Sequence, residues 1–163
     1  MQSLATKQTP NLILSMLTLP IGASRFQSLR TRMAKAFAGL AILLMLIVVA
    51  EFYFAARGGF STAPREESYR PHHALGYVIF LLPLLMAVVA AVARMPRRLV
   101  GLSALVAGLT AVQVLIAKVA GAIGDAGPLV FGLHAVGGLA LAAVAWMLLR
   151  ESLGRQPDKH ITH

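Results

Sequence analysis

The stretch Leu129–Leu149, LVFGLHAVGGLALAAVAWMLL, decides the fold of this chain. It holds no charged residue, and about twenty apolar residues are enough for a helix to cross a hydrocarbon core of roughly 30 Å. A single histidine, His134, lies near its start. Histidine inside lipid is uncommon and indicates a functional site, because its polar ring needs a partner there.

Three further apolar runs precede this stretch. Membrane-spanning helices are therefore predicted at residues 36–56, 72–93, 99–122 and 129–149. Of the 163 residues, 58% are hydrophobic and 13% are charged, against roughly 45–50% and 25% in soluble domains. We expect an all-α integral membrane protein whose main partner is the lipid bilayer.

The connections between the predicted spans are short, so consecutive helices must be antiparallel neighbours. The fold class expected is an antiparallel four-transmembrane-helix bundle at residues 36–149. An arm at residues 1–35 precedes it and a tail at residues 150–163 follows it. In the arm, Asn11–Leu19 is too short to span and is expected to lie on the membrane surface as a helix. It is alternatively the core of a signal peptide, or the chain truly starts at Met33.

Basic residues predict the orientation. Eleven lysines and arginines flank the spans on the side of the two termini, and three occupy the opposite side. The positive-inside rule then places both termini in the cytoplasm, and we expect the inner membrane of a bacterium. The net charge of +9 comes from these flanking residues. Because they form no continuous stripe, a nucleic-acid partner is not expected.

Absent residue types narrow the chemistry. The chain has no cysteine, which excludes disulfides, thiolate catalysis, iron–sulfur ligation and covalent haem attachment. The sequence shows no Ser/His/Asp set and no phosphate-binding loop. No catalytic activity of its own is therefore expected.

Two histidines share a pattern with a glycine four residues later, His72 with Gly76 and His134 with Gly138. Residues at i and i+4 lie on one helix face, so each glycine leaves flat space beside an imidazole for an edge-on porphyrin. Neutral imidazole nitrogen is a good iron ligand. A b-type haem between the second and fourth helices is one interpretation. In the other, His72 is an interfacial residue like its neighbour His73, and His134 bonds a neighbouring helix.

The depths of the two histidines do not match. His134 lies sixteen residues from Arg150, whereas His72 lies twenty-two from Arg94. At about 1.5 Å per residue the mismatch is about 9 Å. Helix tilt, a bend at Pro83, or continuation of the fourth helix beyond Arg150 would absorb it.

Glu51 and Lys118 are the charged residues predicted inside the spans. Both lie about one turn from the outer ends of their helices, where they can pair with one another or extend outward to water. Lys118 alternatively faces a haem propionate. Gln113, deeper in the third span, is expected to hydrogen-bond across the bundle.

The chain resembles two known families. The chain resembles one four-helix half of a haem A synthase at two places. One is the set Gln113, Ala117, Pro128 and Leu133-His134, and the other is the run His72-His73-Ala74-Leu75-Gly76. That resemblance implies a b-type haem with His72 and His134 as axial ligands to the metal. The chain also resembles an uncharacterised family of small four-helix bacterial membrane proteins, through Phe54, Ala55, Ala56 and Gly58.

The match to haem A synthase is incomplete around the second-helix histidine. That family carries a glutamate a few residues before it and an arginine just after it. Here Tyr69 stands three residues before His72, Glu67 stands five before it, and His73 takes the place of the arginine. Pro71 also interrupts the approach to the helix. The resemblance therefore implies haem binding without the oxidative chemistry, and it leaves His73 as an alternative ligand.

The sequence thus predicts a membrane b-type haem-binding protein for electron transfer or haem handling, within a larger respiratory complex or alone. The alternative is a cofactor-free accessory or scaffold subunit of a respiratory or photosynthetic membrane complex. Other membrane subunits or a second copy of the chain are the expected protein partners. A transporter or proton channel using Glu51, Lys118 and His134 as a relay ranks last, because four short helices leave little room for an aqueous path.

Overall fold

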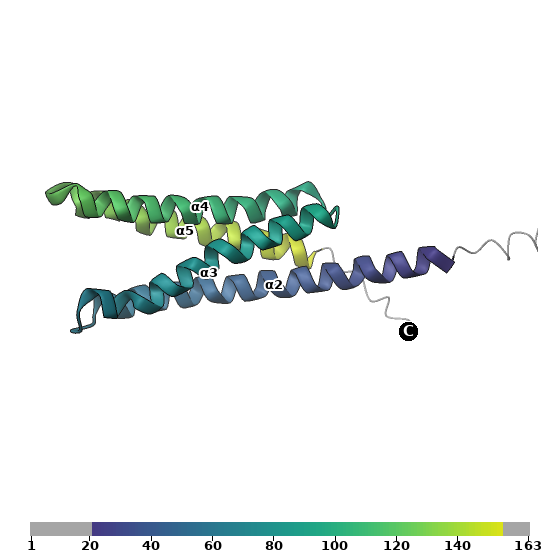
Figure 1. Cartoon of the computed structure of the whole chain (residues 1–163), viewed down its shortest axis with the longest axis horizontal. Coiled ribbons are helices and arrows are strands. Elements are labelled where there is room, and N and C mark those ends of the chain that lie inside the picture. Colours follow the sequence, from purple (N-terminus) through teal and green to yellow (C-terminus); the bar gives the residue numbers. More distant parts are fainter. Residues whose placement is uncertain (1–20, 155–163) are drawn as a thin grey trace, which may run out of the picture. The chain divides into compact units, whose positions relative to one another are not determined.

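Long apolar helices make up the part of the chain that the computed structural model describes, residues 21–154. They are α2 (Ile21–Gly59), α3 (Arg65–Val92), α4 (Arg97–Ala122) and α5 (Gly127–Leu153), with a 3-10 turn, η1 (Gly124–Ala126), before α5 (Figure 1). No strand occurs within residues 21–154. The surface helix predicted at Asn11–Leu19 and the end of the predicted tail lie outside the described residues.

Each of these helices contains a stretch long and apolar enough to cross a bilayer. The stretches are Gln27–Gly59, Arg65–Val92, Arg97–Ala122 and Gly124–Leu153. This is the composition of an all-α, multi-pass membrane bundle in a lipid environment.

The chain divides into two units, Met1–Arg32 and Met33–His163. In the first unit, the described residues 21–32 are helical. The second unit holds the rest of α2 and all of α3, α4 and α5, and it contains the core and the candidate site.

The helices extend beyond the predicted spans. The first helix begins at Ile21 rather than 36, and α3 begins at Arg65 rather than 72. Pro64 precedes α3, and Glu66 and Glu67 occupy its first turn, where negative charge is favourable to the helix dipole. The helix continues through Pro71, because a proline removes only one backbone hydrogen bond. The expectation that Pro71 interrupts this segment was wrong.

Short connections make successive helices antiparallel (Figure 1). The connections are residues 60–64, 93–96 and 123–126. The return from α4 to α5 is tight: Gly124 has a φ of 59°, and a Cβ on buried Gly127 would overlap the carbonyl oxygen of Ala120. A left-handed φ and a close backbone approach both favour glycine.

The hydrophobic core lies in the half of the bundle next to the turn at residues 93–96. We call this the apolar half. Its buried residues come from all four helices: Phe37, Ala41, Leu44, Val48, Ile79, Met86, Ala90, Leu99, Leu102, Val106, Leu141, Ala145, Leu148 and Leu149. Because lipid is as apolar as these side chains, close van der Waals packing is the main attraction that they contribute.

Candidate functional site

The opposite half of the bundle holds four polar side chains, one from each helix. Glu51 lies on α2, His72 on α3, Gln113 on α4 and His134 on α5. We call these residues the polar cluster. The ring centroids of His72 and His134 are 6.3 Å apart, with 65° between the ring planes. The fold therefore brings together the two histidines that the sequence singled out.

Gln113 and His134 bond each other in both directions. The Gln113 amide nitrogen Nε2 donates to the backbone carbonyl of His134 at 2.6 Å, and His134 Nδ1 lies 3.1 Å from the backbone carbonyl oxygen of Gln113. A carbonyl oxygen can only accept, so Nδ1 carries the ring hydrogen and Nε2 keeps its lone pair. The hydrogen bond across the bundle predicted for Gln113 is confirmed.

His72 has a carboxylate partner. Its Nδ1 lies 3.1 Å from Glu51 Oε1, and each of the two side chains is 18% exposed. Glu51 Oε2 and His72 Nδ1 are both buried and make no hydrogen bond among the described residues, so the 3.1 Å contact is an ion-pair contact. A carboxylate facing Nδ1 favours the hydrogen on that nitrogen, which again leaves Nε2 with a lone pair.

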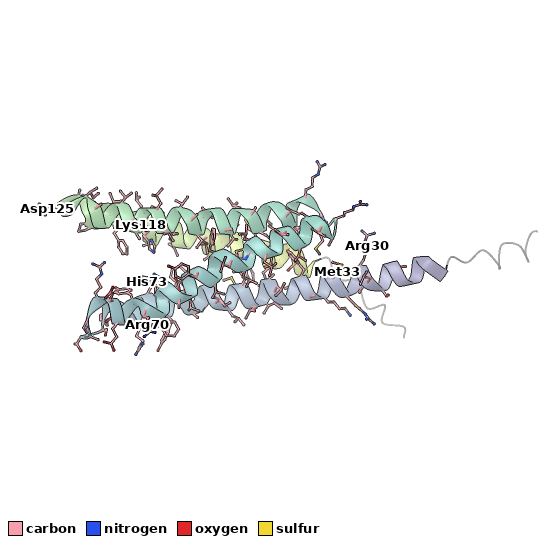
Figure 2. The ribbon with its side chains drawn as sticks, in the orientation of Figure 1. Arg30, Met33, Arg70, His73, Lys118 and Asp125 are labelled. Atoms are coloured by element: carbon pink, nitrogen blue, oxygen red, sulfur yellow. The ribbon has the colours of Figure 1, made fainter. Side chains whose placement is uncertain are left out.

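Lys118 is not the partner of Glu51. Glu51 faces His72, and no ion pair joins Glu51 to Lys118 within residues 27–154. Lys118 is exposed on α4, and Figure 2 places it with Asp125 at the end of the bundle that also holds Arg70 and His73. This exposure fits a lysine side chain that extends outward from the membrane to water.

Aromatic rings cover the two imidazoles. Phe131 stacks on His134 with centroids 5.0 Å apart and 7° between the planes. Tyr69 meets His72 edge-on at 6.0 Å, and the Tyr69 ring packs against Gly58 of α2. These contacts restrict rotation of both imidazole rings.

Glycines of the site admit the groups that orient the histidines. A Cβ on Gly76 would lie 3.5 Å from Glu51 Oε1, and one on Gly138 would lie 3.4 Å from the Phe52 ring. On Gly137 it would overlap Gln113 Oε1. The sequence pattern had suggested open space for a porphyrin beside Gly76 and Gly138. Glu51 and Phe52 of α2 lie at contact distance from these two glycines.

The remaining predicted residues fall at different places. His73 is exposed, and its ring lies 6.4 Å from that of Tyr69. The expected mismatch in depth does not keep His72 and His134 apart, and α5 continues past Arg150 to Leu153. Among the described residues, no group of three or more histidine, cysteine, aspartate or glutamate side chains could hold a metal ion.

Sequence reasoning missed the partner of Glu51 and the roles of Phe131 and Gly137. A signal existed for the first of these. Glu51 lies eight residues before the end of α2 at Gly59, and His72 lies seven after the start of α3 at Arg65. In an antiparallel hairpin with a short loop, such positions lie at similar depth.

Residues 51–122 match DUF6220, a family of unknown function. The matched segment includes Glu51, His72 and Gln113 of the polar cluster, and His134 follows it. No curated protein and no solved structure shows significant similarity to the chain. The comparisons thus agree with a resemblance to an uncharacterised family over part of the chain, and they do not support the link to haem A synthase.

Proposed function

We propose that this chain is a membrane b-type haem-binding protein for electron transfer or haem handling, in which His72 and His134 would hold the iron. The observation that carries the proposal is the pair of imidazoles that face each other from α3 and α5 at a centroid distance of 6.3 Å. Imidazole nitrogens bind transition metals at about 2 Å, so two rings this close could both reach one ion. The spacing therefore suits one shared ion.

The groups that lie at Nδ1 of the two histidines suit the same role. Histidines that ligate metals usually donate the other ring N–H to a carboxylate or backbone carbonyl, which fixes the tautomer and the ring orientation. Glu51 and the Gln113 carbonyl lie at Nδ1 of His72 and His134, respectively. Nε2 of each ring is then the nitrogen available to iron. When bound, haem supplies one-electron redox chemistry at a potential that these partners help to set.

The protein's own residues would hold the ligands rigid and dry. Phe131 and Tyr69 place aromatic rings against the imidazoles, and Phe52 lies beside Gly138. Gly76 and Gly138 act through the side chains that they admit, since those side chains orient the two rings. Lys118 is one of the cations available to a propionate at this end of the bundle.

The orientation proposed from the sequence completes this function. With eleven basic residues on the side of the termini and three on the other, both termini face the cytoplasm. The polar cluster then lies toward the outer leaflet of a bacterial inner membrane. An electron partner on that side, or other membrane subunits, would have the shortest path to the haem.

An absorption spectrum tests the proposal. The full chain, produced with sufficient haem and purified in mild detergent, should show the sharp visible bands of a low-spin, six-coordinate haem. His72→Ala and His134→Ala should each abolish these bands. His73→Ala is the matched control, because it removes an adjacent but exposed imidazole, and it should keep them. A folded, colourless wild-type protein contradicts the proposal, as does loss of the bands in His73→Ala alone.

A cofactor-free accessory subunit is the second candidate, and one observation favours it. A Cβ added to Gly39, Gly101, Gly108 or Gly132 would have no heavy atom within 4 Å. These glycines leave flat patches on the outside of the bundle, of the kind that lets helices of another subunit approach closely. Co-purification of a constant set of membrane proteins with colourless chain would favour this function. A coloured, solitary bundle would contradict it.

A further inference from the structure

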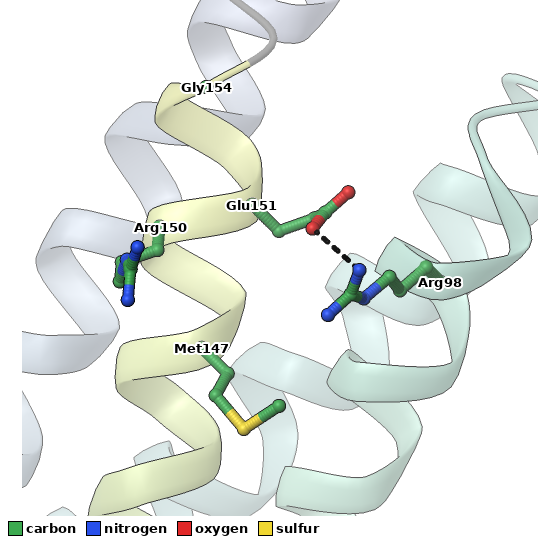
Figure 3. A pocket seen from close by; sticks show the side chains of 5 residues that line it. All are labelled: Arg98, Met147, Arg150, Glu151 and Gly154. Atoms are coloured by element: carbon green, nitrogen blue, oxygen red, sulfur yellow. Dashed lines mark ion pairs between the residues drawn. The ribbon is translucent and has the colours of Figure 1, made fainter.

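A pocket opens at the end of the bundle opposite the polar cluster. It lies between the start of α4 and the end of α5 (Figure 3) and has a volume of about 510 Å³. The described residues that line it are Arg98, Met147, Arg150, Glu151 and Gly154. The proposed haem site uses none of them.

Two arginines and one glutamate belong to the lining, with Arg98 and Glu151 on one side of α5 and Arg150 on the other (Figure 3). Arg98 Nη1 lies 3.4 Å from Glu151 Oε2, yet the Arg98 side chain remains 64% exposed. Arg94 and Arg97, close by in the same turn, add positive charge to this end of the molecule. Exposed guanidinium groups bind phosphate through parallel N–H bonds. The charge and chemistry of the pocket therefore suit a phosphate group.

The pocket lies where the apolar surface ends. Met147 provides an apolar wall and is 46% exposed, and Trp146 beside it is 51% exposed. Tryptophan is enriched at membrane–water interfaces. A ligand here has its charged end among arginines and its neighbouring atoms against a thioether and the hydrocarbon region. A soluble phosphate compound would leave the apolar wall unused.

We propose that this pocket binds the phosphate headgroup of an anionic phospholipid. Basic pockets between membrane helices are a recurrent way of holding such lipids. Arg98 and Arg150 contact the phosphate, and Met147 contacts the start of the acyl chains. Glu151 limits the affinity, because its carboxylate competes with the phosphate for Arg98.

Trp146 gives a direct measurement, because it is the only tryptophan of the chain and lies one helical turn before Arg150. The full-length protein is placed in vesicles that contain brominated phosphatidylglycerol or brominated phosphatidylcholine, and quenching of its fluorescence is compared. We expect preferential quenching by phosphatidylglycerol. Each arginine should contribute about fivefold to the preference.

Matched variants separate the pocket from general surface charge. Arg98→Gln with Arg150→Gln should reduce the preference about twenty-fivefold. Arg94→Gln with Arg97→Gln removes the same charge outside the described lining, and should reduce it by no more than about twofold. Glu151→Gln should increase the preference, because it frees Arg98. A purely structural ion pair predicts no such increase. Circular dichroism of every variant checks that the helices are intact.

Three results would overturn the proposal. The first is equal quenching by the two lipids in the wild-type protein. The second is an equal loss of preference in the two double variants. The third is displacement of the brominated phosphatidylglycerol by millimolar inorganic phosphate, because that would make the pocket a site for a soluble anion.

Discussion

The two halves of the bundle are built from the same four helices and differ in what they bury. The apolar half buries aliphatic and aromatic side chains such as Phe37, Leu44, Met86 and Leu148, each exposed by 2% or less. The other half holds the polar cluster, and burying polar groups in a bilayer costs stability. The difference indicates that the two halves have different roles. Packing in the apolar half holds the helices in register, so that the polar cluster, whose burial lowers stability, can form in the other half.

The largest effect on haem binding should come from a side chain added at a glycine beside the polar cluster. Gly137→Leu places a side chain where Gln113 Oε1 lies, so we expect loss of the Gln113–His134 pair and of the haem bands. Gly108→Leu is the control, because a Cβ there meets no heavy atom within 4 Å. Visible absorption per mole of helical protein measures both. Equal spectra in the two variants would contradict the idea that the polar cluster and the apolar half have different roles.

Truncation in the apolar half should lower stability and spare the site. In Leu148→Ala the hydrophobic transfer term nearly vanishes in lipid, while the cavity term remains, so we expect a loss of about 2 kcal/mol in unfolding free energy. Leu139→Ala removes the same atoms from a side chain that is 66% exposed on the same helix, and should cost far less. Unfolding in mixed micelles measures both. Similar losses would show that the two halves are not packed differently.

Removal of the Glu51 carboxylate beside His72 should weaken haem binding more than it lowers the stability of the fold. Loss of an orienting partner weakens metal binding about tenfold or more, so Glu51→Ala should release haem to an acceptor protein about tenfold more readily. Glu51→Gln keeps an acceptor oxygen and should recover much of the difference. Unchanged haem transfer in Glu51→Ala would mean that the 3.1 Å contact does not support the ligand.

The smallest effect should come from removal of the Gln113 side-chain amide on α4, and we expect it in the free energy of unfolding. Gln113→Leu removes the donor to the His134 carbonyl, and hydrogen bonds between membrane helices contribute about 1 kcal/mol. Unfolding in mixed micelles should show a loss of that size. Val114→Leu, at a position 50% exposed on the same helix, is expected to leave stability unchanged. A loss in unfolding free energy above about 3 kcal/mol would contradict this, because it would mean that Gln113 stabilises the fold as strongly as a core residue.

Much of the fold was predictable from the sequence. Long apolar runs without charge have few alternatives to membrane-spanning helices, so the centres of the predicted spans lie within α2, α3, α4 and α5. The short connections left little choice but antiparallel neighbours. The ends were less predictable, because Ile21–Lys35 and Arg65–Pro71 are polar segments that continue helices already formed.

The contacts of the site were harder to predict. Helical spacing indicates which residues share a face of one helix, but the rotation of α2 against α3 depends on packing along their whole length. For this reason the sequence offered Glu51 either a pair with Lys118 or extension outward to water, whereas it faces His72. The glycines mislead in the same way. A glycine indicates space, and only the fold shows that Glu51 and Phe52 fill it.

The paired bonds between Gln113 and His134 have a consequence for how the protein is made. Both residues belong to the last two helices, joined by a turn of only a few residues. This hairpin satisfies its own imidazole N–H and amide donor before any earlier helix packs on it. It is therefore competent to leave the translocation channel as a preassembled pair and then to dock on α2 and α3, which are synthesised first.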